Sequence, residues 1–147
     1  KMTQPKDASD VHYALYERYI TERHADGDMF PPSRDQFEKF LIHSCTDSFF
    51  LELWLDDRLI SVSTCDPLDD GLSAVYTFFD PNEGSERGLG TFALMWQIQW
   101  AQELKLPYVY PGYWIQESPK MSYKVRFQPI EGFVNNQWVP LDKPELD

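Results

Sequence analysis

At 147 residues the chain has the size of one domain, and its 42% hydrophobic and 16% aromatic residues exclude a disordered chain. No apolar run approaches the roughly 20 residues of a membrane-spanning helix, and the first residues lack the apolar core of a secretion signal. We therefore expect a cytoplasmic protein without membrane contact, and a fragment or processed chain because the first residue is not Met. The net charge of -11 argues against binding nucleic acid through overall charge alone.

Two helices are predicted at the start of the chain. Apolar and aromatic side chains repeat at helical spacing over residues 10–23, with Ser9 as the N-cap. A loop rich in Gly and Pro follows over residues 25–32. Ser33 and Gln36 then have the spacing of a capping box, which opens a second helix. The buried stripe of that helix is expected to consist of Phe37, Phe40 and Leu41.

Three strands are predicted next. Residues 49–55 and 59–65 flank the turn Asp56-Asp57, and a loop rich in Pro, Asp and Gly separates them from a third strand over residues 73–79. Strands that follow one another through short turns pair as an antiparallel meander, which is the arrangement we expect here.

The cysteines and histidines do not form a metal-binding pattern. Cys45 and Cys65 lack CxxC or Cys/His spacing, so they predict neither a disulfide framework nor a zinc site. We expect buried thiols and no metal site from these two cysteines. His12, His24 and His43 stand isolated in the sequence, and a lone histidine at a helix end is more often a capping or surface residue than a base.

A glycine turn follows the predicted strands and a loop over residues 80–86. The turn consists of Arg87, Gly88, Leu89, Gly90 and Thr91. Glycines before a helix N-terminus let the backbone approach phosphate or another anion, although such a pair is more often only a tight turn. The helix after it runs to about residue 104, and its apolar residues cover most of its circumference, so we expect it to be sandwiched in the core.

The last part of the chain concentrates the basic residues. Residues 86–126 carry five basic and three acidic side chains, which leaves a net charge of -13 on the remainder. A short buried strand is predicted over residues 108–110, and further strands at residues 126–127 and 137–139. Ser118-Pro119 has the sequence of a helix start, which predicts a short helix from Lys120.

On that predicted helix, Lys120, Tyr123 and Lys124 would share one face. Two ammonium groups and a phenol at a helix start suit a carboxylate or a phosphate, and a solvated basic turn is the equal alternative. The order of elements predicts a mixed α/β domain, and we expect a single domain over residues 1–147.

These segments resemble a known family, most specifically in Lys-Met-Ser-Tyr-Lys from Lys120 to Lys124 behind Gly-Tyr-Trp-Ile from Gly112. The chain looks like the C-terminal domain of arginyl-tRNA–protein transferases and of their bacterial relatives, the aspartate/glutamate leucyltransferases of the N-degron pathway. The glycine turn resembles the arginine-serine-leucine-glycine-threonine turn of that family. The resemblance runs from about His12 to Pro140.

The resemblance implies an α/β fold like that of the acyl-CoA N-acyltransferases (GNAT), a mixed sheet flanked by helices, used here with aminoacyl-tRNA. It implies transfer of an amino acid onto the N-terminus of proteins that begin with Asp or Glu, which marks them for degradation. It also implies a further N-terminal domain whose clustered cysteines bind a metal or an iron–sulfur cluster. None of those cysteines is in this chain, so we expect no cofactor here. Ser118 replaces a cysteine of the eukaryotic arginyl enzymes, which favours leucine over arginine as the donor.

We assign hypothetical roles to the residues of these segments. Residues at the glycine turn would hold the terminal adenosine and phosphate of the tRNA, namely Arg87, Gly88, Gly90 and Thr91. Aromatic residues would line the transfer cleft, namely Tyr113 and Trp114. Basic residues would read the acidic side chain of the acceptor, namely Lys120, Lys124 and Arg126. Tyr123 would orient a substrate or assist proton transfer.

Two other functions fit the same residues. An acyl-CoA-dependent N-acyltransferase also has a glycine turn before a helix, and it would bind acetyl-CoA. A module without catalytic activity would recognise acidic N-termini and transfer nothing.

Overall fold

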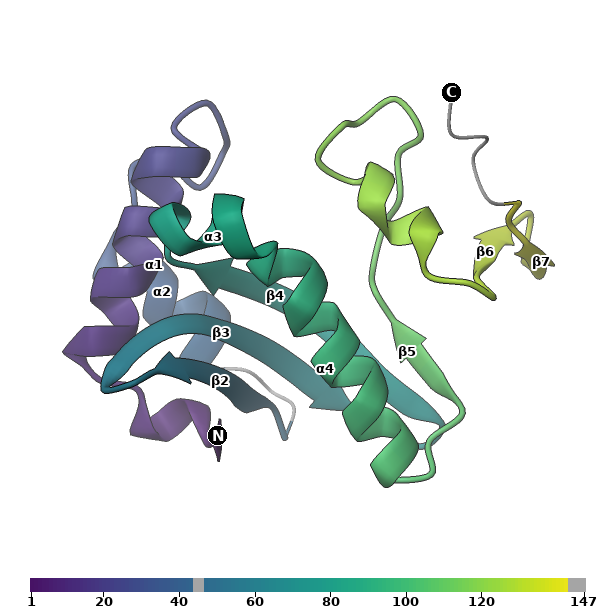
Figure 1. The fold of residues 1–147 in the computed structure, drawn as a ribbon, viewed down its shortest axis with the longest axis horizontal. Helices are drawn as coiled ribbons and strands as arrows, with labels where there is room; N and C mark the ends of the chain where they lie inside the picture. Colours follow the sequence, from purple (N-terminus) through teal and green to yellow (C-terminus); the bar gives the residue numbers. More distant parts are fainter. Residues whose placement is uncertain (44–46, 143–147) are drawn as a thin grey trace. The chain divides into compact units, whose positions relative to one another are not determined.

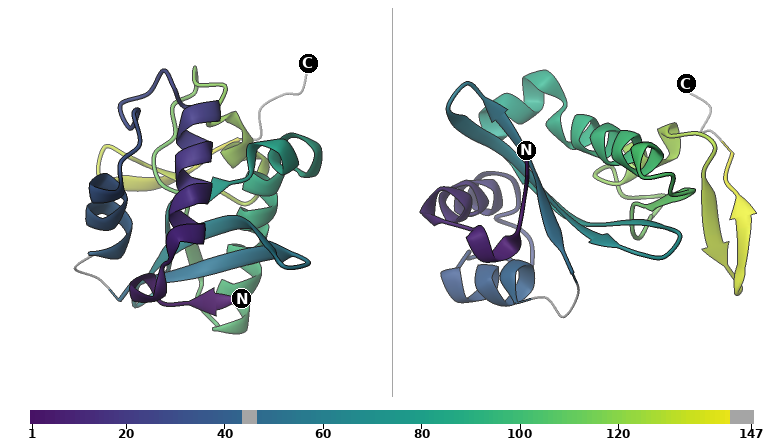
Figure 2. Two further views of the ribbon diagram at one scale, coloured as in Figure 1. Left: turned by 90° about the vertical axis from the view of Figure 1, so that its left-hand side faces the viewer. Right: turned by 90° about the horizontal axis from the view of Figure 1, so that it is seen from below.

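The computed structural model describes residues 1–43 and 47–142 and forms two compact units, Lys1–Pro111 and Gly112–Asp147. The first unit contains a five-stranded sheet in the order β1-β2-β3-β4-β5 with helices on both faces (Figures 1 and 2). Cys45 lies outside the described residues. No helix among the described residues is long and apolar enough to cross a membrane.

The helices on one face of the sheet follow the predicted pattern. After β1 (Met2–Thr3) and the 3-10 turn η1 (Pro5–Asp7), α1 (Asp10–Arg23) begins behind Ser9 and buries its aromatic and aliphatic stripe. Helix α2 (Arg34–Phe37) begins at Ser33, whose hydroxyl accepts the N–H of Gln36 at 3.1 Å. Both predicted N-caps are therefore confirmed.

The second helix changes its winding after its first turn. It continues as the π-helical turn η2 (Glu38–Ile42), closed by the N–H of His43 on the carbonyl of Glu38 at 2.9 Å. A π-turn rotates the following side chains relative to an α-helix. Phe37 and Leu41 are buried as predicted, but Phe40 is 42% exposed, so its assignment to the buried stripe was wrong.

The predicted antiparallel meander is confirmed. Strands β2 (Phe49–Leu55), β3 (Arg58–Pro67) and β4 (Gly71–Phe79) pair antiparallel in sequence, and the left-handed Asp56 makes the first turn. Because side chains alternate along a strand, Phe50, Val62 and Phe78 are buried in the cluster that contains α1 residues. Phe49 and Cys65 join a second cluster with Ala101 on the opposite face.

A helical crossover connects β4 to the last strand of the sheet. The chain passes through α3 (Pro81–Arg87) and α4 (Leu89–Glu103) before β5 (Tyr108–Tyr110), which pairs parallel to β4. The loop predicted over residues 80–86 is therefore wrong. Asp80 caps α3 by accepting the N–H of Asn82 at 3.0 Å, and Pro81 occupies the first turn, where its missing N–H costs nothing.

The second unit contains the 3-10 helix η3 (Ser122–Arg126) and a hairpin of β6 (Glu131–Val134) and β7 (Gln137–Pro140). Asn135 and Asn136 both have positive φ, as a two-residue hairpin turn requires. The strand predicted at residues 137–139 is confirmed. The strand predicted at residues 126–127 is wrong. The N–H of Phe127 bonds back to the carbonyl of Lys124 at 3.2 Å, which extends the 3-10 turn of η3 to this residue.

Candidate functional site

The glycine turn joins two helices instead of a strand and a helix. Gly88 ends α3 with φ +58°, and its N–H bonds to the carbonyl of Gly84 at 3.1 Å. A Cβ built on Gly88 meets nothing within 4 Å, so the left-handed backbone, and not lack of space, calls for glycine there. The turn thus directs the chain from α3 into the first turn of α4.

The first turn of α4 is open to a ligand. Gly90 lies in it with only Phe79 nearby, at 3.5 Å from a built Cβ, and Thr91 is exposed. The first N–H groups of an α-helix have no partner within the helix and carry a partial positive charge. A phosphate can therefore accept hydrogen bonds from this turn.

Arg87 is held beside the turn by an ion pair. Its Nε donates to Glu83 at 2.7 Å, one helical turn earlier, and Arg58 donates to the same carboxylate. The hydrogen bonds from the two arginines lower the pKa of Glu83 and outweigh the opposite effect of its partial burial. The Arg87 side chain stays 54% exposed, so it can bind an anion while Glu83 fixes its position.

An apolar cavity of about 540 Å³ lies next to the glycine turn. Strands β2 and β3 supply Leu53, Trp54 and Ile60, and α4 supplies Leu89 and Phe92. Sequence reasoning missed Leu53 and Trp54, because an apolar residue of a strand gives no sign of whether it faces the core or a cavity.

The long helix is only partly buried. Its inner side contributes Leu89, Ala93, Leu94, Gln97 and Ala101 to the interior. Phe92, Met95 and Trp96 are 44%, 54% and 42% exposed, so the predicted sandwiching of α4 was wrong. Apolar residues on nearly every side of this helix fill the core on one side and leave aromatic surface on the other.

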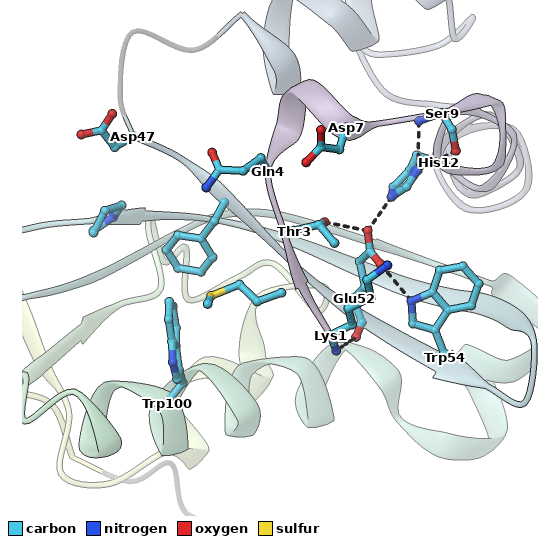
Figure 3. A pocket seen from close by; sticks show the side chains of 13 residues that line it. Lys1, Thr3, Gln4, Asp7, Ser9, His12, Asp47, Glu52, Trp54 and Trp100 are labelled. Carbon is cyan, nitrogen blue, oxygen red and sulfur yellow. Dashed lines mark hydrogen bonds and ion pairs between the residues drawn. The ribbon is translucent and has the colours of Figure 1, made fainter.

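A second pocket, of about 850 Å³, contains a buried histidine–glutamate pair (Figure 3). Nε2 of His12 lies 2.6 Å from Glu52, which also accepts hydrogen bonds from Thr3 at 2.7 Å and from Trp54 at 2.9 Å. Burial raises the pKa of Glu52, but these three hydrogen bonds outweigh it and leave the pKa below its ordinary value. The view of His12 as an isolated residue was therefore wrong.

The basic segment of the second unit is a turn rather than a helix start. Lys120 lies before η3, in a turn where the N–H of Met121 bonds to the carbonyl of Ser118 at 3.0 Å. The hydroxyl of Ser122 donates to the carbonyl of Pro119 at 2.9 Å. In a helix that carbonyl would accept a backbone N–H instead, so the side chain competes with helix formation. The predicted helix start at Lys120, and with it the shared helical face, was wrong, because the short helix of this segment begins at Ser122.

Lys124 supports the backbone of its neighbouring segment. Its Nζ donates to the carbonyl of Tyr113 at 2.6 Å, while the ring of Tyr113 is 89% exposed. Burial lowers the pKa of Lys124 and raises the pKa of Tyr123. Trp114 is partly buried, and Lys120 and Arg126 are exposed.

The predicted site residues thus fall into two groups. The first unit holds Arg87, Gly88, Gly90 and Thr91 together at the start of α4. The second unit holds Tyr113, Trp114, Lys120, Tyr123, Lys124 and Arg126. That the two groups serve one cleft stays a prediction.

A family model described as "Arginine-tRNA-protein transferase, C terminus" matches residues 11–134, which include both groups. The chain belongs to this family. The chain is 64% identical over 138 residues to an aspartate/glutamate leucyltransferase of Acinetobacter baumannii, a match covering 94% of the chain and 51% of that relative.

Other relatives of the chain carry the same name. The protein of Acinetobacter baylyi is 63% identical over 92% of the chain and 50% of the relative. The protein of Marinobacter nauticus is 54% identical over 91% of the chain and 56% of the relative. The chain spans about half the length of the curated relatives it matches. The family predicted from the sequence is confirmed.

Proposed function

We propose that the protein transfers leucine from leucyl-tRNA to the N-terminal amine of proteins that begin with Asp or Glu, in the cytoplasm, and thereby marks them for degradation. The observation that carries this proposal is the 64% identity, over 94% of the chain, to relatives named aspartate/glutamate leucyltransferase. Those names state both the acceptor residues and the donor amino acid.

The chemistry requires alignment more than activation. The acceptor amine attacks the carbonyl carbon of the aminoacyl ester, the tetrahedral intermediate expels the ribose oxygen, and an amide bond replaces the ester. The proton lost by the amine ends on the ribose hydroxyl of the released tRNA. An N-terminal amine has a pKa of about 8, so an appreciable minority of it is free base near neutral pH. Holding amine and ester in contact can supply roughly 7–11 kcal/mol of the barrier.

The residues present can divide this work. Arg87 and the N–H groups after Gly88 would hold the phosphate at the end of the tRNA, since Glu83 fixes the guanidinium beside the first turn of α4. Tyr113 and Trp114 would line the transfer cleft. Tyr123 would orient the acceptor amine or pass its proton, and its half-buried phenol, whose pKa is raised by burial, stays protonated at neutral pH.

The acceptor carboxylate would be read by Lys120 and Arg126, both exposed cations. Lys124 belongs to the same group, but its ammonium is committed to the carbonyl of Tyr113. We therefore assign Lys124 the additional task of fixing the segment that carries Tyr113 and Trp114.

The connection between β4 and β5 supports a GNAT-like assignment of the fold. Helix α4 crosses from β4 to a parallel β5, and their pairing is limited to Gly71–Ser73 with Tyr108–Tyr110. Strand β4 continues to Phe79 beyond that pairing. We propose that the two units act together as one aminoacyltransferase domain.

The cavity beside the glycine turn favours leucine as the donor. Most of its lining is apolar and suits an aliphatic side chain, namely Leu53, Trp54, Ile60, Leu89 and Phe92. The cations of Lys1 and Arg87 also line it and would disfavour a guanidinium. An arginyl donor would need a carboxylate for its guanidinium. Glu52 reaches the same cavity, but it is buried and already accepts hydrogen bonds from three donors.

The deciding experiment measures transfer by the full-length protein. Labelled leucyl- and arginyl-tRNA are offered with peptides that begin with Asp, Glu or Ala. We expect leucine on the Asp and Glu peptides only, and loss of that transfer in Lys120→Ala. Arginine transfer would correct the donor. Peptide binding without any transfer would identify a recognition module, and acetyl transfer from acetyl-CoA would identify an ordinary N-acyltransferase.

A further inference from the structure

Arginines from three separate elements meet at one end of the sheet in the first unit. Helix α1, the start of β3 and the end of α3 each contribute one, and Figure 1 shows α1 and α3 beside the end of β4. A further arginine from the end of α1 lies over the ring of Phe79, at 5.1 Å from its centroid. Together these are four of the six arginines of the chain, namely Arg18, Arg23, Arg58 and Arg87.

The buried carboxylate of Asp80 anchors two of these arginines. Its side chain is only 2% exposed, and it accepts hydrogen bonds from Arg18 at 3.2 and 3.3 Å and from Arg58 at 3.2 Å. Burial raises the pKa of Asp80, but its hydrogen bonds and the two guanidinium groups have a larger opposite effect. The pKa therefore lies below its ordinary value, and the carboxylate stays ionised. Glu83 accepts hydrogen bonds from both Arg58 and Arg87 and so links these two arginines.

These ion pairs leave each guanidinium with unused donors. A guanidinium carries five N–H bonds. Within the described part of the chain, Arg18 directs three of them at carboxylates, Arg58 two and Arg87 one. The three side chains are 42%, 54% and 54% exposed. An arginine held along one edge by a carboxylate can present its other edge to a phosphate.

Fixed guanidinium groups suit a rigid polyanion better than mobile lysines do, because less side-chain entropy is lost when they bind. Their position adjoins the glycine turn, since Gly88 directly follows Arg87. The carboxylates of Glu22, Asp80 and Glu83 offset part of the positive charge of these arginines. In a protein of net charge -11, the attraction for a phosphate is therefore limited to atoms close to the guanidinium groups.

We propose that Arg18, Arg23, Arg58 and Arg87 form a phosphodiester-binding face that receives the backbone of the acceptor end of aminoacyl-tRNA. The inference rests on the proposed function and adds to it three arginines outside the glycine turn. It also explains how an acidic chain meets nucleic acid, because a small set of positioned guanidinium groups replaces overall positive charge.

The test is the salt dependence of binding of uncharged tRNA to the full-length protein, measured by fluorescence anisotropy. Each phosphate contact contributes about 0.7–0.9 to the slope of log affinity against log salt. We expect Arg58→Gln and Arg87→Gln each to weaken binding several-fold and to reduce the slope by about that amount. Arg58→Lys should keep the slope, because it keeps the charge.

Arg34→Gln is the matched control. Arg34 also pairs with a carboxylate, Asp10 at 2.7 Å, lies over the ring of Tyr13, and is 49% exposed, but it belongs to a different part of the unit. Its replacement should leave the slope unchanged. Thermal melts of all variants show whether each is folded.

Glu83→Gln supplies a test that does not remove any arginine. It frees Arg58 and Arg87 from the carboxylate that holds them, so tRNA binding should weaken although a negative charge is lost, and unchanged or tighter binding counts against the proposal. If the unaltered protein binds and transfers, yet Arg58→Gln and Arg87→Gln behave like Arg34→Gln, the phosphodiester face is wrong and the proposed function stands. If the unaltered protein neither binds tRNA nor transfers, the proposed function itself fails.

Discussion

The imidazole of His12 and the carboxylate of Glu52 form a buried pair with a defined proton position. Nδ1 of His12 accepts the backbone N–H of Ser9 at 3.1 Å, so the proton of the neutral ring is on Nε2, which donates to Glu52 across 2.6 Å. The pair joins the start of α1 to the middle of β2. It therefore fixes the first helix on the sheet.

Replacement of His12 by Ala should strongly destabilise the fold. The variant leaves the carboxylate of Glu52, whose side chain is 1% exposed, without one of its donors. Leaving a buried charged group short of a hydrogen-bond partner typically costs about 1–3 kcal/mol or more of unfolding free energy. Urea denaturation at pH 7 measures the loss, and His43→Ala, at an exposed position, should change little. Equal stability of the two variants would show that the pair contributes nothing.

Stability should fall in acid, in part through Glu52. Its folded-state pKa lies below the ordinary value, so at intermediate pH the unfolded chain binds more protons. The contribution is complete above the unfolded pKa of about 4.3 and disappears as pH falls through the folded pKa. Urea midpoints between pH 7 and pH 3 should show this loss, and Glu52→Gln should flatten it. The pKa shifts of Asp80 and Glu83 act in the same direction and remain in that variant.

Two nearby glycines should respond in opposite ways to alanine. At Gly84 a Cβ would lie 2.3 Å from the buried ring of Phe79, so Gly84→Ala should cost about 1–3 kcal/mol of stability. At Gly90 the nearest atom is an ordinary 3.5 Å away, and alanine in a helix is favourable by up to about 1 kcal/mol. Gly90→Ala should therefore keep or raise the melting temperature while reducing leucine transfer, if the backbone must approach the tRNA.

Gly90→Ala separates packing from function at the turn. Full transfer activity in a stable variant would remove Gly90 from the site. Loss of activity together with loss of stability would instead point to a packing role that the surroundings of Gly90 do not predict.

The sequence predicts the elements whose signals are local. Ser9 and Ser33 mark helix starts, and the alternation in residues 49–79 fixes the meander. Helix α3 escaped prediction because Pro81 and Gly84 are loop-forming residues in isolation. Its helical state depends on the cap by Asp80, which is itself held by arginines distant in sequence.

The site was predictable only where neighbours in sequence carry it. The glycine turn and the basic segment stand out in the sequence, and family resemblance gives them meaning. Arg18 and Arg58 lie on other elements, and only the fold brings them to Asp80. Likewise no pattern joins His12 to Glu52, which are 40 residues apart. Side chains that meet through tertiary contacts leave no local signal.

The thiol of Cys65 should resist alkylation in the folded protein. Burial, with a smaller effect of neighbouring Asp66, raises its pKa to about 12, so almost no thiolate exists at pH 8. In a Cys45→Ser background, iodoacetamide should label Cys65 only after denaturant unfolds the chain. Rapid labelling of the native protein would show that the strand carrying Cys65 opens readily.

Lys124 should prove to be a support for the backbone rather than only a reader of the acceptor. Because its ammonium donates to the carbonyl of Tyr113, Lys124→Ala frees that segment, and the amides of residues 113–115 should exchange faster with deuterated water. Lys120→Ala should leave that exchange unchanged while it abolishes transfer to Asp peptides. If Lys124→Ala impairs transfer without faster exchange, the hydrogen bond to Tyr113 does not order the segment, and direct contact with the acceptor becomes the better account of Lys124.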